Sequence, residues 1–272
     1  MNGILSGLPD FFAPGVATAT VLVALRVGGL LIVAPAWSSK QIPMKLRTAL
    51  LVLFAVLLLP SGMESANRAG LAITPASFLT ESALGMAFGL SAALTLAGAE
   101  FAGELMTTTI GLSGAAIFDP VNNTQGSILA SFMQILALVI LMGTGGHLFM
   151  LQALGQSFSI FPLGAPIEIG AGLFALVKSA STIFATGVQF ASPVIAAVML
   201  ANIALAILGR AAPQLQIMSV AFPLQIGLGL LTVAGSLGLL VQTLGHWAPR
   251  YQQHLDTFAR AAQVAPAPAG RR

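Results

Sequence analysis

Long apolar runs with almost no charge make up most of this chain, and short polar links separate them. Of its 272 residues, 57% are hydrophobic and only 7% are charged, and the mean hydropathy is +0.93. A soluble domain averages about 25% charged residues, so this chain could not cover a water-facing surface. The composition predicts an all-α membrane protein, because a helix satisfies its backbone polar groups within its own segment.

About six hydrophobic segments can be separated along the chain. A crossing helix needs about 20 residues, so the second segment is too short to span comfortably and suits a re-entrant or buried helix. The fifth is far longer than one crossing and predicts either two elements or one bent helix. The segments are Phe11–Trp37, Thr48–Pro60, a run starting near Phe78, Ile128–Leu154, Ile169–Leu208 and Ile217–Val241.

Charge placement argues against a plain six-helix bundle. The cations from Lys40 to Arg47 and those of the C-terminal tail should share the cytoplasmic side, yet six spanning segments would put them on opposite sides. We therefore expect the second segment not to cross, which leaves the Gly98–Ser127 stretch facing outward. We expect residues 1–248 to form a single membrane-embedded domain and residues 249–272 to be a basic, Pro/Ala-rich, disordered tail.

Few charges lie within or beside the apolar runs. Arg26 is near the middle of the first run, where a charge costs about 2.5–3.5 kcal/mol on insertion scales. We expect it to be buried against protein, with Glu100 or Glu104 as its partner; snorkelling to the interface is the alternative. Lys178 begins a polar face on the fifth run. Arg26, Glu100, Glu104 and Lys178 are the candidate buried charges or assembly contacts.

Close helix contacts are indicated at two glycine pairs. Gly28 and Gly29 lie two and three residues after Arg26, and Gly85 and Gly89 form a GxxxG pattern. Such small residues let helix backbones approach in membranes, although GxxxG is also common by chance in Gly-rich apolar sequence.

The Gly98–Ser127 stretch begins with Glu100 and Glu104 at helical i,i+4 spacing and then becomes rich in Gly, Ser, Thr and Asn around Phe118-Asp119-Pro120. A polar segment between apolar helices needs protein or water around its backbone, so we interpret it as a loop that lines or closes a pore; a simple connector is the alternative. The candidate gating residues are Ile110, Gly111, Gly114, Ile117, Phe118, Asp119, Pro120, Asn122 and Asn123.

The sequence offers little for catalysis. Cysteine is absent, and there is no HExxH, GxSxG or pair of neighbouring Asp residues. We expect no enzyme activity, no metal site, no cofactor and no nucleic-acid partner. The rival function is an ion-coupled secondary transporter. It rests on the charges named above and His147, but no internal repeat with paired broken helices is evident.

Several stretches together resemble the FliR family of flagellar type III export-gate membrane proteins and its injectisome counterparts. They cover nearly the whole chain in the expected order: residues 25–60 (LRVGGLLIVAPAWSSKQIPMKLRTALLVLFAVLLLP), the Phe118-Asp119-Pro120 loop, residues 146–164 (GHLFMLQALGQSFSIFPLG) and residues 209–230 (GRAAPQLQIMSVAFPLQIGLGL).

This resemblance implies a function and partners. Members of the family assemble with FliP and FliQ into the gate through which unfolded flagellar subunits cross the bacterial inner membrane, within the flagellar basal body. FlhB-like and FlhA-like export proteins are further implied partners. A loop of the FliR-like subunit helps to plug the closed pore, and Ile110 to Gln125 matches that loop here.

Overall fold

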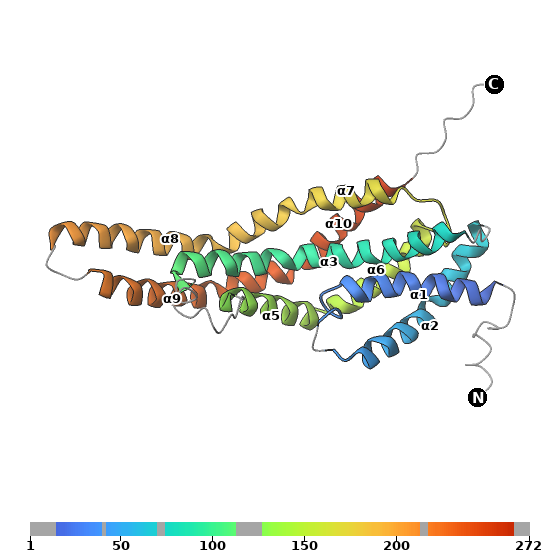
Figure 1. Cartoon of the computed structure of the whole chain (residues 1–272), viewed down its shortest axis with the longest axis horizontal. Helices are drawn as coiled ribbons and strands as arrows, with labels where there is room; N and C mark the ends of the chain where they lie inside the picture. The colour runs from blue at the N-terminus through green and yellow to red at the C-terminus, as the bar shows by residue number, and fades with distance from the viewer. Residues whose placement is uncertain (1–14, 40–41, 70–73, 113–126, 213–216, 264–272) are drawn as a thin grey trace, which may run out of the picture. The chain divides into compact units, whose positions relative to one another are not determined.

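All regular structure that can be described in this chain is helical. The computed structural model describes residues 15–39, 42–69, 74–112, 127–212 and 217–263. Figure 1 shows their helices in chain order. They are α1 (Val16–Val33), α2 (Met44–Ala69), α3 (Pro75–Ile110), α5 (Ile128–Gly143), α6 (Gly146–Ile160), α7 (Ile169–Ser179), α8 (Ser181–Ala211), α9 (Ile217–Gly245) and α10 (Trp247–Ala262). The prediction of an all-α membrane protein is confirmed.

The described helices fall into two compact units. Unit 1 is drawn from Met1–Ala93, Gly145–Ser179 and Ala248–Arg272, and unit 2 from Leu94–Thr144 and Ala180–Trp247. Residues of α3 belong to both. That residues 1–248 form one membrane-embedded domain stays a prediction.

Five of the described helices are long and apolar enough to cross a membrane. They are α1, α2, α3, the Ile169–Ala211 stretch made of α7 and α8 together, and Ala221–Gly245 of α9; a sixth is counted if the bent pair α5–α6 is one span. The cations lie at the N-terminal end of α2, so α2 and the three candidate spans after it separate them from the C-terminal tail. Four crossings would return the tail to the same side of the membrane as those cations. The charge pattern therefore favours a bent α5–α6 pair that does not cross.

The prediction that the second apolar segment is too short to span is wrong. Helix α2 is 26 residues long, and 24 of them, Met44–Asn67, qualify as a candidate span. The apolar run ends at Pro60, but the helix continues to Ala69. The more polar residues that follow Pro60 are also compatible with a helix. A proline within a membrane helix is tolerated when neighbouring groups satisfy the freed carbonyl. The outward placement of the Gly98–Ser127 stretch depended on a short second segment, so it loses this support.

The disordered tail was predicted to begin too early. Residues 249–262 belong to α10, whose inward side chains Tyr251, His254, Phe258 and Ala262 are all buried in unit 1. They recur every three or four residues, which is the period of one helix face. Burial and the neighbouring Arg250 lower the pKa of His254. Residues 264–272 lie outside the described part of the chain.

Glycine brings α1 and α3 into backbone contact. A Cβ added at Gly29 would lie 2.4 Å from the carbonyl oxygen of Ser82, and one at Gly85 would lie 1.9 Å from that of Arg26. At Gly89 the nearest atom, Ala34 N, would be 2.9 Å away. The GxxxG pattern is therefore a packing surface here, and the adjacent Gly29 fits against it.

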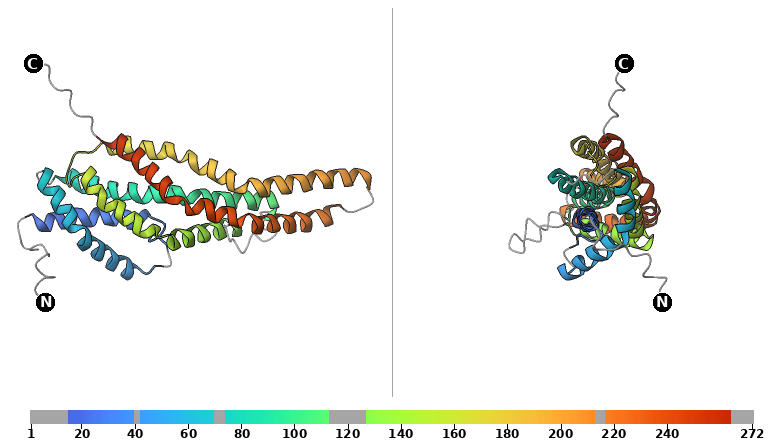
Figure 2. Two further views of the ribbon diagram at one scale, coloured as in Figure 1. Left: turned by 180° about the vertical axis from the view of Figure 1, so that it is seen from behind. Right: turned by 90° about the vertical axis from the view of Figure 1, so that its right-hand side faces the viewer.

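In unit 2, α8 and α9 run side by side as a hairpin (Figures 1 and 2). The side chains of Asn202 and Gln225 are hydrogen-bonded across it. Most of its large apolar side chains are exposed in the chain by itself, including Leu200, Ile203 and Leu231. Such a surface requires lipid or other protein subunits around it.

Candidate functional site

Only the N-terminal end of the predicted gating segment lies within the described part of unit 2; the description resumes at Ser127, after the segment. Ile110 is buried at the last position of α3, and Gly111 follows with a positive φ of 87°. The other seven candidates lie outside the described residues: Gly114, Ile117, Phe118, Asp119, Pro120, Asn122 and Asn123.

A chain of hydrogen bonds joins the residues on either side of this segment. The hydroxyl of Thr107 on α3 donates to the carbonyl oxygen of Gly103 at 2.8 Å. A threonine hydroxyl has one proton, so in the hydrogen bond between Thr107 and Ser127 it is Ser127 that donates. Ser127 also caps α5, where its Oγ accepts from the backbone N–H of Ala130 at 3.1 Å.

Backbone packing reinforces this link. A Cβ at Gly103 would lie 2.5 Å from the Cα of Ala130 and 2.6 Å from the carbonyl oxygen of Leu129, so α3 and α5 touch without intervening side chains. From α9, Gly229 lies under Ile110, and a Cβ there would be 2.5 Å from Ile110 Cγ1. The residues between Ile110 and Ser127 therefore begin and end at one fixed point, on three packed helices.

A second feature, in unit 1, is a fully buried ion pair. Arg26 on α1 donates from Nε to Glu81 Oε2 on α3 at 2.6 Å, and both side chains are 0% exposed. Its other nitrogens donate to Ser157 Oγ on α6 and to the carbonyl oxygen of Phe161, each at 3.0 Å. The ring of Phe158 covers the guanidinium with its centroid 4.3 Å from Cζ.

The same network fixes the turn after α6. Glu81 Oε1 accepts from the backbone N–H of Gly164 at 3.1 Å, and Ser65 Oγ on α2 accepts from that of Leu163 at 3.3 Å. One cation and one carboxylate thus tie α1, α3 and α6 to this turn, and α2 is joined to it by Ser65. A buried charge pair is stable only when its remaining hydrogen-bonding groups are satisfied in this way.

The expected burial of Arg26 is observed, but the predicted partner was wrong. Glu81 is the partner, whereas Glu100 and Glu104 are exposed; Glu100 accepts from Gln134 Nε2 at 3.2 Å. Lys178 is also exposed. Glu100, Glu104 and Lys178 are therefore not buried charges in the chain by itself. That they take part in assembly stays a prediction.

Glu81 was missed although the sequence contained a signal for it. It precedes Gly85 of the GxxxG pattern by four residues, and residues four apart lie on the same face of a helix. A helix face that contacts α1 through glycine also presents its carboxylate toward α1.

The described residues contain no group of three or more His, Asp or Glu side chains that could hold a metal ion. His147, considered for proton transfer, is partly exposed at the start of α6, and its Nδ1 has no hydrogen-bond partner among the described residues. The ordered polar groups thus hold helices together and anchor a segment.

These properties define an integral membrane protein built of packed helices, with a segment held at both ends. The family described as "Bacterial export proteins, family 1" matches residues 17–249. The chain is 32% identical to the flagellar biosynthetic protein FliR of Pectobacterium carotovorum subsp. carotovorum over 235 residues, which are 85% of each chain.

Two further FliR proteins are similar over most of their length. That of Escherichia coli K12 is 32% identical and covers 82% of this chain and 85% of its own. That of Caulobacter vibrioides is 29% identical and covers 87% and 94%. The chain therefore belongs to the FliR family of bacterial export proteins, which confirms the resemblance seen in the sequence. It is a component of the export apparatus and not an enzyme.

Proposed function

We propose that this chain is a subunit of the flagellar type III protein export gate in the bacterial inner membrane, at the flagellar basal body. FliP-like and FliQ-like subunits complete the pore around it, and FlhB-like and FlhA-like proteins contact the gate. The cargo is unfolded flagellar protein, and the segment from Ile110 to Gln125 helps to close the pore.

The double anchor of that segment carries the proposal. A segment that moves aside for a translocating chain has to return to the same position, and this requires fixed ends. The Thr107–Ser127 hydrogen bond and the Gly103–Ala130 contact supply such ends. The exposed apolar surface of α8 and α9 supports an assembly, because sister subunits would cover it.

The ion-coupled transporter receives less support. Its strongest candidate, Arg26, uses all three guanidinium nitrogens for Glu81, Ser157 and Phe161, so it is a structural cation.

Purification separates the two functions. The affinity-tagged chain, extracted from its host membranes in mild detergent, should copurify with two other small helical membrane proteins in a complex much larger than 27.8 kDa. A chain that purifies alone and moves a small solute when reconstituted into liposomes would refute the gate.

Deleting Gly111–Asn122 should leave the gate assembled but leaky. The anchors at Thr107 and Ser127 remain, so the helices keep their packing while the closing segment is lost. The measurement is ion or small-solute leakage across the inner membrane, compared in cells with equal amounts of assembled gate.

A matched variant replaces residues 113–122 by a Gly/Ser linker of equal length. If the segment is only a connector, this variant will be as tight as the wild type, whereas a closing role predicts that it leaks like the deletion. Tight membranes in both variants would exclude the gating role.

A further inference from the structure

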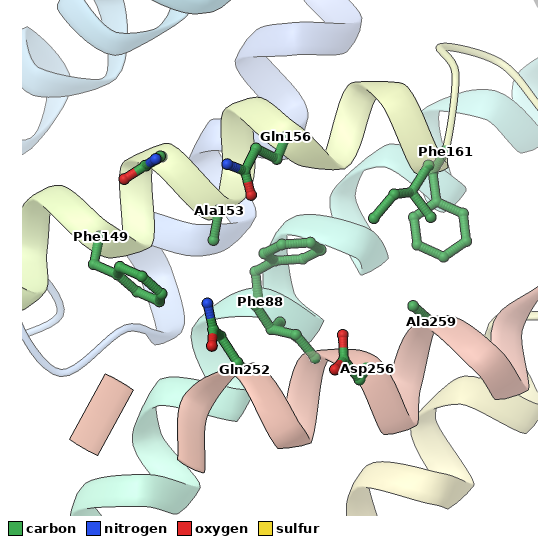
Figure 3. A pocket seen from close by; sticks show the side chains of 11 residues that line it. Phe88, Phe149, Ala153, Gln156, Phe161, Gln252, Asp256 and Ala259 are labelled. Atoms are coloured by element: carbon green, nitrogen blue, oxygen red, sulfur yellow. The ribbon is translucent and has the colours of Figure 1, made fainter. Parts of the chain in front are cut away.

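A groove lies between α6 and α10 in unit 1; three phenylalanine rings are spread along it, and glutamine side chains reach into it from both helices (Figure 3). Its volume is about 360 Å³. The rings are those of Phe88, Phe149 and Phe161, from α3, α6 and the residue after α6. A site that combines aromatic faces with amide donors and acceptors suits an extended peptide.

The polar groups of the groove form two pairs on facing helices. Gln152 and Gln156 are one turn apart on α6, and Gln252 and Asp256 are one turn apart on α10. All four are exposed. Within the part of the chain that the structure describes, no cation lies within ion-pair distance of Asp256. The groove therefore presents amides that can both donate and accept, and one carboxylate that lacks a cation.

We propose that residues 264–272 of this chain bind in the groove. Their sequence is Val-Ala-Pro-Ala-Pro-Ala-Gly-Arg-Arg, and they follow α10, which ends at Ala262. Alternating proline favours the polyproline II conformation, which advances about 3.1 Å per residue. Nine such residues reach about 28 Å, whereas Asp256 lies only about 9 Å back along the helix at 1.5 Å per residue.

The chemistry of this tail complements the groove. Pro266 and Pro268 pack against Phe149, the groove ring that is partly exposed, whereas Phe88 and Phe161 are buried. The main-chain carbonyls of a polyproline II segment have no internal hydrogen bonds and accept from glutamine amides. Arg271 or Arg272 supplies the cation for Asp256. The tether keeps the tail at a high effective concentration, so weak contacts are sufficient. Most of α10 and the whole tail follow residue 249, where the family match ends.

Cross-linking tests the proposal directly, because the chain has no cysteine of its own. Gln156→Cys and Gln152→Cys are each combined with Ala269→Cys in the full chain, and membranes are treated with a copper–phenanthroline oxidant. A disulfide forms only where Cα atoms come within about 7 Å. We expect an intramolecular disulfide for at least one pair, identified by mass spectrometry of tryptic peptides.

The matched control is Gln189→Cys with Ala269→Cys, because Gln189 is equally exposed on α8 of unit 2; it should give no intramolecular link. Absence of the link at both groove positions, or links only to another copy or another protein, would overturn the proposal.

Charge reversal tests the ion pair. Asp256→Lys should lower the yield of the groove disulfide roughly threefold to tenfold, and adding Arg271→Glu and Arg272→Glu should restore it. An unchanged yield in Asp256→Lys would show that the tail does not reach this carboxylate.

Discussion

Replacing Arg26 by methionine should destabilise the folded chain by about 3–5 kcal/mol, because it leaves the buried carboxylate of Glu81 without its cation. Glu81 would keep only the N–H of Gly164 as a hydrogen-bond donor, at a position that is 0% exposed. The partners of the guanidinium at Ser157 and Phe161 would also lose a donor. Unfolding of the purified chain in detergent, followed by circular dichroism against denaturant, measures the loss.

The double variant Arg26→Met/Glu81→Met separates the ion pair from simple packing. Removing both charges removes the uncompensated carboxylate, so the double variant should be more stable than Arg26→Met alone. The control is Arg210→Met, which removes an exposed cation from α8 and should change stability by less than about 0.5 kcal/mol. If Arg26→Met is as stable as this control, the ion pair does not hold the helices together.

Adding a single methyl group at Gly85 should force α1 and α3 apart. In Gly85→Ala the new Cβ would meet the backbone carbonyl oxygen of Arg26 at 1.9 Å, and a backbone atom cannot rotate away as a side chain does. Overpacking of this kind costs about 1–3 kcal/mol or more. Moving the helices would also lengthen the hydrogen bond between Arg26 and Glu81, so the same unfolding measurement should show a large loss.

Gly235→Ala is the matched substitution, because Gly235 is also inside a helix but has no atom within 4 Å of an added Cβ. Alanine is better than glycine in a helix by up to about 1 kcal/mol, so this variant should be as stable as the wild type or slightly more stable. The two glycine variants should therefore change stability in opposite directions. A loss of the same size at both positions would mean that helix contact is not the cause.

Which stretches form helices could largely be predicted from the sequence, because helix formation depends on residues that are close together in the chain. Helix α5 ends at Gly143, inside the glycine-rich stretch Gly143-Thr-Gly-Gly, where Gly145 has a φ of 76°. The length of the run Ile169–Leu208 predicted either two elements or one bent helix, and the structure has two helices, α7 and α8, with Ala180 between them. Apolarity alone misjudged α2, because a helix can extend beyond its apolar run into charged residues.

The C-terminal helix shows a different limit. Residues 247–262 are too polar to resemble a membrane run, and the Pro/Ala-rich end beyond them suggested disorder. Their buried face of Tyr251, His254, Phe258 and Ala262 has the period of a helix, but it becomes stable only when other helices cover it. A Cβ at Gly172 of α7 would lie 2.6 Å from the ring of Phe258, which shows how closely that cover fits.

Composition and helix periodicity are local properties, so they were enough to predict a helical membrane protein, and the resemblance of several stretches to the FliR family predicted the family. The pairing of Arg26 with Glu81 is seen only in the tertiary structure, as is the hydrogen bond between Thr107 and Ser127 on either side of the proposed gating segment. Such pairings join residues far apart in the chain. They depend on which helix faces meet. In this chain, glycines at the contact faces let the backbones of α1 and α3, and of α3 and α5, come into contact.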